Sequence, residues 1–138
     1  ESCPNISFLK IEIDKTTSQY EEYLENYFSE LGNRKINLFT DISNYLSYEL
    51  GQPTHCYDFS KISSEIVLKT SEENMQFETL TDKKVELSNS NLVFAMDNKI
   101  INLAGVMGGK ETACSDSTTT VLVECAFFVY KTSTHPLR

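Results

Sequence analysis

The sequence predicts a single β-rich domain of the α+β class, with helices packed on its sheets. Apolar residues recur at helical spacing in two segments before residue 51, whereas short alternating segments separated by turn residues follow residue 63. Chains that keep helices and strands in separate regions are typical of α+β folds. The 138 residues contain no internal repeat or linker, so residues 1–138 are expected to form one domain.

A strand and an amphipathic helix are expected at the start of the chain. Ser7–Asp14 alternates apolar and polar residues, as a strand does. Thr16–Leu31 has the spacing of a helix, with Ser18 and Glu21 placed as a capping box and Gly32 as a C-terminal stop. The residues expected on its buried face are Tyr20, Tyr23, Leu24, Tyr27, Phe28 and Leu31.

A second helix is expected near Asp41–Leu50, and strands dominate after it. Gly51 ends this helix and Pro53 prevents its continuation. The residues expected to face inward are Ile42, Tyr45, Leu46 and Leu50. Asp97-Asn98 has the composition of a tight hairpin turn. The candidate strands are Glu65–Lys69, Gln76–Leu80, Lys84–Leu87, Asn91–Met96, Lys99–Ala104 and Thr120–Cys125.

Charge and composition count against several classes of protein. The formal net charge is −8, and binding to a phosphate backbone depends on Lys and Arg, so any nucleic-acid contact is expected to be local or shared with other domains. No apolar run reaches the roughly 18 residues of a membrane span, and no signal or transit peptide opens the chain, so no membrane contact is expected. Both ends of the sequence resemble cuts inside a longer polypeptide.

The four cysteines, Cys3, Cys56, Cys114 and Cys125, indicate neither a zinc site nor a disulfide framework. None lies two to four residues from another, as zinc ligands commonly do. Cys56 and Cys125 stand in apolar sequence and are expected to be small buried hydrophobic residues. Unpaired thiols are typical of a reducing cytosol, which predicts a cytoplasmic location.

Glu124 is the most informative single residue, because it lies within the apolar run Val121–Phe128. If this run is a strand, both of its faces are largely apolar, which predicts a central strand. Burying a carboxylate is costly unless a partner satisfies it, so Glu124 is a candidate binding residue. The alternative is an edge-strand Glu that reaches water or pairs with a Lys.

Two further regions are candidate parts of a site. His55 follows a helix end in a Gly/Pro turn, which holds a side chain at a fixed place on the surface; it is otherwise a surface or capping histidine. Asn44 precedes it on the second helix and is either a ligand or a structural amide. Ala104–Gly109 follows a strand, and its glycines allow close approach of a ligand or form a plain tight turn. The glycine spacing is neither a dinucleotide fingerprint nor a P-loop.

Together these segments resemble the B3/B4 region, the editing domain, of the β subunit of bacterial phenylalanyl-tRNA synthetase. The resemblance rests on several long motifs in the same order over most of the chain. They are Ile36-Asn37, Asp41–Tyr45, Glu49–Asp58, Thr79-Leu80, Leu92-Val93 with Asp97, Ala104–Gly109, Thr118 and Leu122–Phe128.

This resemblance implies a layered B3/B4 fold within an (αβ)₂ heterotetramer. The α subunit of that enzyme joins phenylalanine to tRNA(Phe) with ATP and magnesium, and the B3/B4 domain itself uses no cofactor or metal. The editing domain binds the tRNA 3′ end and hydrolyses tRNA(Phe) mischarged with tyrosine. Carried over by motif, the positions of the editing pocket are Asn44, His55, Ala104, Gly105, Gly108 and Glu124, with the tyrosine moiety as editing substrate.

The chain departs from the family pattern in two places. The family continues past Phe127-Phe128 with a Thr-Asp-Ala-Ser run that also lines the pocket, and this chain ends at Arg138 before reaching it. Cys56 stands where the family more often has Ala, a difference expected to affect packing only. The first departure leaves open whether the chain on its own forms a complete editing site.

A mechanism follows from the difference of one hydroxyl between phenylalanine and tyrosine. A hydrophobic synthesis pocket cannot strongly reject an added hydroxyl, so a second site must supply the discrimination. A buried Glu124 carboxylate would accept a phenol O–H, backbone N–H groups of Gly105–Gly109 would stabilise the oxyanion, and His55 and Asn44 would orient the water or the ribose. The alternative is a non-catalytic module of the same fold that binds RNA or another subunit.

Overall fold

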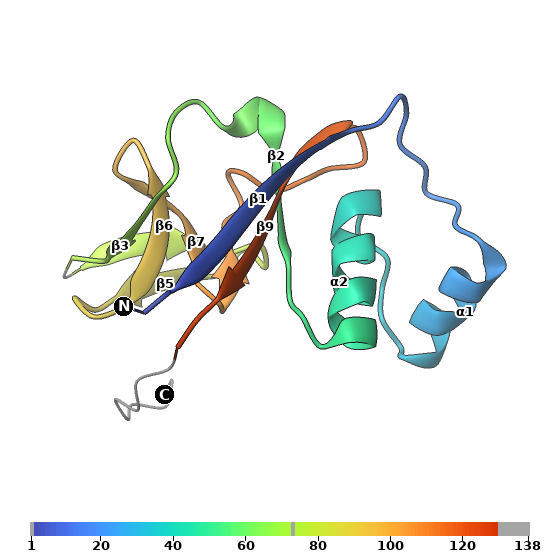
Figure 1. The fold of residues 1–138 in the computed structure, drawn as a ribbon, viewed down its shortest axis with the longest axis horizontal. Helices are drawn as coiled ribbons and strands as arrows, with labels where there is room; N and C mark the ends of the chain where they lie inside the picture. The colour runs from blue at the N-terminus through green and yellow to red at the C-terminus, as the bar shows by residue number, and fades with distance from the viewer. Residues whose placement is uncertain (1, 73, 130–138) are drawn as a thin grey trace.

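The computed structural model describes residues 2–72 and 74–129. It has the mixed, antiparallel architecture expected of an α+β fold, with a three-stranded sheet at its centre (Figure 1). This sheet has the order β1-β9-β2, formed by Asn5–Glu12, Thr120–Phe127 and His55–Asp58. The expectation of a central strand around Glu124 is therefore confirmed, since β9 is paired on both edges.

The remaining strands form a four-stranded sheet and a separate hairpin. The sheet has the order β3-β6-β7-β8, and the hairpin pairs β4 with β5. Asp97 and Asn98, between β6 and β7, have φ angles of +49° and +63°, which confirms the expected tight turn. The strands of the sheet are Val67–Thr70, Leu92–Met96, Lys99–Leu103 and Met107–Gly108, and those of the hairpin are Met75–Glu78 and Lys84–Leu87.

The three-stranded sheet is covered on both faces, because its strands alternate between two cores. On one face Tyr57 is fully buried against Phe94, Met96 and Ile101 of the four-stranded sheet. On the other face Cys56 and Val121 pack against Phe39 of α2 (Leu38–Leu50). In Figure 1 the four-stranded sheet and the helices accordingly lie on opposite sides of β1, β9 and β2.

The first helix is shorter than expected. Helix α1 spans Glu22–Glu30, and its N-cap residue Glu21 makes no side-chain capping bond, so the predicted start at Thr16 and the Ser18 capping box are wrong. The preceding segment is held by tertiary bonds instead: the backbone N–H of Tyr20 donates to Glu25 at 3.0 Å, and its phenol donates to Asp41 at 2.6 Å.

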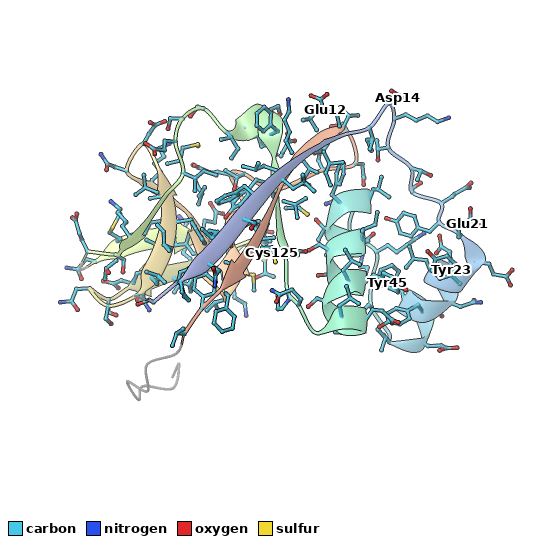
Figure 2. The ribbon with its side chains drawn as sticks, in the orientation of Figure 1. Glu12, Asp14, Glu21, Tyr23, Tyr45 and Cys125 are labelled. Atoms are coloured by element: carbon cyan, nitrogen blue, oxygen red, sulfur yellow. The ribbon has the colours of Figure 1, made fainter. Side chains whose placement is uncertain are left out.

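The predicted buried face of α1 is only partly correct. Leu24 and Phe28 are buried, but Tyr23 is 62% exposed and Leu31 is 48% exposed. Figure 1 shows the reason: α1 lies beyond α2, away from the sheets, and so has a neighbour on one side only. Tyr23 packs edge-on against the Tyr45 ring, with 6.4 Å between ring centroids (Figure 2).

Helix α2 ends as expected but buries a different face. Gly51 closes it with φ +67°, and Asn37 caps its start by accepting from the N–H of Thr40. The predicted inward positions Ile42, Leu46 and Leu50 are exposed, whereas the buried positions of α2 are Phe39, Asp41 and Ser43. Hydrogen bonds explain the difference: Asp41 accepts from Tyr20 and from the backbone of Ile36, and Ser43 bonds to Thr54.

The predicted strands are all present, with ends within two residues of those expected. β2 and β8 were not predicted, because four and two residues give too short a pattern to recognise. All four cysteines are free; Cys56 is buried as expected, whereas Cys125 is only half-buried. Within the described residues, no helix has the length and hydrophobicity needed to cross a bilayer.

Candidate functional site

A cavity of about 400 Å³ lies where the end of β9 meets the start of β2 and the loop before β8. Three backbone segments that are distant in sequence form its wall. These are 51–55, 105–108 and 126–128, and the side chains of Asn102 and Glu124 also line it. The cavity is therefore assembled by the sheet pairings rather than by any one local motif.

Four of the six predicted site residues meet in this cavity: His55, Gly105, Gly108 and Glu124. Ala104 lies just before the loop and packs against the core cluster that contains Tyr57, so it supports the wall from behind. Asn44 is exposed on α2 and is not among the described residues that line the cavity. Its expected role in orienting water or ribose thus rests on the resemblance alone.

Glu124 is buried, with 5% of its surface exposed, because it lies in the central strand between Phe8 of β1 and His55 of β2. Its Oε2 accepts a hydrogen bond of 2.5 Å from the phenol of Tyr57. Burial raises the pKa of Glu124 to about 7, and the Tyr57 hydrogen bond opposes this rise by stabilising the carboxylate. Glu124 is therefore a buried acid that changes charge near neutral pH.

His55 opens β2 and lies opposite Glu124 in the strand register. It is therefore part of a strand, not of the turn in which the sequence placed it. Its ring packs edge-on against Tyr57, with 4.4 Å between centroids, and its buried Nε2 has no hydrogen-bond partner among the described residues. Burial lowers the pKa of His55 to about 4, so the ring is neutral at physiological pH.

The absence of a side chain at Gly108 leaves the space that the His55 ring occupies. A Cβ built on Gly108 would lie 2.1 Å from His55 Cε1 and 2.8 Å from its Nε2, so any side chain at this position would displace the imidazole. Gly105 has φ +72°, a conformation that glycine adopts without strain. The glycines of this loop thus do two different things: one admits the histidine ring, and the other turns the backbone along the wall of the cavity.

Two residues of the site were missed by the sequence analysis. Tyr57 is fully buried, and Asn102 is 3% exposed; the Asn102 amide donates to the Tyr57 phenol at 2.8 Å. The sequence could have indicated Tyr57 as a site residue, because residues i and i+2 of a strand share a face and His55 was already a candidate. Asn102 carried no such signal, because an amide in a strand is typical of polar surface.

Within the residues that the structure describes, no group of three or more His, Cys, Asp or Glu side chains is placed to hold a metal ion. The site brings together a buried acid, a neutral imidazole, an amide, a phenol and the backbone of a glycine loop. These groups can orient a hydroxyl and a water molecule in the cavity.

Comparison with known proteins identifies the fold family. The model of the B3/4 domain matches residues 2–135. The chain belongs to the B3/4 domain family. This membership confirms the resemblance stated from the sequence motifs, and it agrees with the α+β layers around the central three-stranded sheet.

The relatives of this B3/4 domain include bacterial phenylalanine–tRNA ligase β subunits. The chain is 34% identical to that of Bacteroides thetaiotaomicron over 129 residues, covering 93% of the chain and 16% of the relative. It is 37% identical to that of Oceanobacillus iheyensis over 117 residues, covering 84% of the chain and 14% of the relative. The chain therefore spans about one sixth of the length of these relatives.

A solved structure with the same fold is an N-terminal fragment of the phenylalanyl-tRNA synthetase β subunit from Pyrococcus horikoshii. The two share a TM-score of 0.61 at 11% sequence identity, over 90% of this chain and 39% of the fragment. At that identity the likeness concerns the fold alone, so the roles of individual residues in this B3/4 domain must come from its own geometry.

Proposed function

We propose that this B3/4 domain is the editing module of a phenylalanine–tRNA ligase β subunit, and that it hydrolyses tRNA(Phe) mischarged with tyrosine. The observation that carries the proposal is the buried carboxylate of Glu124 at the wall of a cavity of about 400 Å³. A cavity of that size admits an aminoacyl group, and a buried carboxylate distinguishes a side chain with a hydroxyl from one without it.

Recognition of tyrosine rests on the carboxylate oxygen that remains available. Oε2 of Glu124 is taken by Tyr57, whereas Oε1 has no hydrogen bond with any described residue. A tyrosine phenol that donates to Oε1 gains a hydrogen bond to a charged acceptor, worth about 1.5–3 kcal/mol. Phenylalanine offers no donor, so it would fill the cavity and leave this oxygen desolvated.

Hydrolysis requires a placed water molecule and donors for the developing oxyanion. His55 is neutral, and its unpartnered Nε2 can accept a hydrogen bond from water; a pKa of about 4 makes it a weak general base, so we assign it the orientation of water. In the loop, the N–H groups of Val106 and Gly109 already donate to Leu103 and Ile101. Of the remaining loop residues, Met107 and Gly108 belong to β8, so we assign the N–H of Gly105, which lies outside the strand at the cavity wall, as the oxyanion donor.

The proposed partners follow from this assignment. The domain would receive the 3′ end of tRNA(Phe), while other domains and the α subunit of an (αβ)₂ heterotetramer hold the rest of the tRNA. This division fits a chain with a formal net charge of −8, which is a poor binder of phosphate backbone. ATP and magnesium would serve the ligation reaction of the α subunit in the cytoplasm and would have no site in this domain.

A deacylation assay tests the proposal. Tyrosyl-tRNA(Phe) and phenylalanyl-tRNA(Phe) are supplied in turn to the β subunit carrying this domain, assembled with its α subunit, and to the 138-residue chain alone. The proposal predicts rapid clearance of the tyrosyl ester and slow clearance of the phenylalanyl ester by the assembly. Equal clearance of both esters at the uncatalysed rate would contradict it and would favour a non-catalytic binding module.

A further inference from the structure

The Glu124 carboxylate already accepts a hydrogen bond from a tyrosine of the protein itself, Tyr57. The Tyr57 phenol donates to Oε2 at 2.5 Å, and Tyr57 is fully buried. Tyr57 lies two residues from His55 in β2 and therefore on the same face of the sheet. The carboxylate is thus never without a donor, whichever amino acid enters the cavity.

A third residue fixes this contact from the neighbouring sheet. The Asn102 amide of β7 donates to the Tyr57 phenol at 2.8 Å and lies 3.4 Å from Glu124 Oε2. The Tyr57 oxygen consequently accepts from one side and donates to the other, which leaves it a single orientation. Its ring is held by the edge contact with His55 and by the core residues Phe94 and Ile101.

We infer that Tyr57 is a positioning residue of the cavity: held by Asn102, its phenol occupies Oε2 of Glu124 and keeps the carboxylate turned so that Oε1 is the oxygen offered to an incoming hydroxyl. A free carboxylate side chain would sample several rotamers and could satisfy itself in ways that bypass the ligand. The inference rests on the proposed function for the identity of the ligand, but the coupling of Tyr57 to Glu124 can be measured without it.

The surroundings of Glu124 allow its titration to be measured without overlap from neighbouring groups. The other ionisable groups that face it are His55 and Tyr57 on β2 and Cys3 just before β1; Phe8 of β1 and Asn102 of β7 do not ionise. The pKa of His55 is about 4, and burial raises the pKa values of Cys3 and Tyr57 above their ordinary ranges. Between about pH 5 and 8, Glu124 is therefore the group in this cluster that titrates.

The direct test is the titration of the Glu124 carboxyl carbon by NMR in the 138-residue chain. Tyr57→Phe removes one hydrogen bond to the charged form, so the midpoint should rise by about one unit, a tenfold change in proton affinity. Tyr20→Phe is the matched control, because it removes a similar phenol–carboxylate bond, to Asp41, outside the site. It should leave the midpoint of Glu124 unchanged.

Two further results complete the test. If Tyr57→Phe fails to fold, Asn102→Leu replaces it; this change removes both hydrogen bonds that Asn102 donates, to the Tyr57 phenol and to Glu124 Oε2, and should raise the midpoint in the same direction. An unchanged midpoint in the folded variants overturns the inference. In the assembled ligase, Tyr57→Phe should reduce the preference for tyrosyl-tRNA(Phe) over phenylalanyl-tRNA(Phe) about five- to tenfold, most strongly at pH values between the parental and the raised midpoint of the Glu124 titration. If the parent protein shows no preference, the proposed function fails, whereas the titration still decides the role of Tyr57.

Discussion

His55 and Glu124 lie directly opposite each other across the antiparallel pair of β2 and β9. The central sheet thereby brings a base whose pKa is lowered to about 4 next to an acid whose pKa is raised to about 7, both by burial. The pair does not form an ion pair, because burial favours the neutral form of each partner. Groups with pKa values displaced in this way cluster at functional sites.

The raised pKa of Glu124 predicts that this residue destabilises the fold above neutral pH. The folded-state value of about 7 exceeds the unfolded value of 4.5, so the stability contribution present below pH 4.5 is lost as the pH rises through 7. Glu124→Gln should therefore raise the free energy of unfolding by about 1–3 kcal/mol at about pH 8 and by almost nothing at about pH 4.

Urea unfolding at the two pH values measures this difference. Glu86→Gln, an exposed substitution on β5, is the control and should change stability little at either pH. A Glu124→Gln variant that is no more stable than the parent at the higher pH would show that the carboxylate is well solvated or paired in the folded protein.

The lowered pKa of His55 predicts a neutral imidazole across the physiological range. The chemical shift of the His55 Cε1 proton should follow protonation of the imidazole with a midpoint near pH 4, well below the ordinary value of 6.5. The imidazole of the unfolded chain is protonated at a higher pH than that of the folded chain, so His55 lowers stability progressively from about pH 6.5 down to pH 4. NMR titration, with the signal assigned by its absence in His55→Asn, measures the midpoint. A midpoint near the ordinary value of 6.5 would restore His55 as a general-base candidate.

The sequence predicted the parts of the fold in which pattern and burial agree. β9 was identified as central because both of its faces are apolar, and Asp97-Asn98 was identified as a turn from its composition. The helices were predicted less well, because their buried faces are set by tertiary hydrogen bonds. The burial of Asp41 depends on Tyr20, which lies 21 positions away and gives no local signal.

The site was predicted in its residue types more than in its connections. Motif resemblance selected His55, Gly105, Gly108 and Glu124, which the sheet pairings bring to one cavity. It could not show that Glu124 already has a phenol partner, since the contact to Tyr57 joins residues 67 positions apart. Tyr57 already occupies one of the two carboxylate oxygens, so phenylalanine in the cavity would leave only Oε1 without a donor.

The contact of Gly108 with His55 predicts a substitution that damages the site more than the fold. In Gly108→Ala the new methyl would overlap the imidazole, and the far end of that ring has to move away. Clearance of tyrosyl-tRNA(Phe) by the assembled ligase should fall by about tenfold or more, because the displaced ring no longer orients water.

Gly32→Ala provides the matched comparison. Gly32 has φ +66°, and a Cβ added there would meet no atom within 4 Å. The change should therefore cost about 1 kcal/mol of stability through backbone strain and leave clearance unchanged. Thermal melting and the clearance assay are run on both variants. Full clearance by Gly108→Ala would mean that the position of the His55 ring does not matter for hydrolysis.

Clearance of tyrosyl-tRNA(Phe) by Glu124→Ala in the assembled ligase tests the central claim most directly, with phenylalanine charging and thermal melting measured on the same protein. Loss of the hydrogen bond to the tyrosine hydroxyl should reduce clearance about tenfold to a hundredfold, while charging in the α subunit stays near the parental rate. Glu124→Gln should lose less, because its amide oxygen still accepts from the phenol. A Glu124→Ala protein that melts like the parent and clears tyrosyl-tRNA(Phe) at the parental rate would contradict the account.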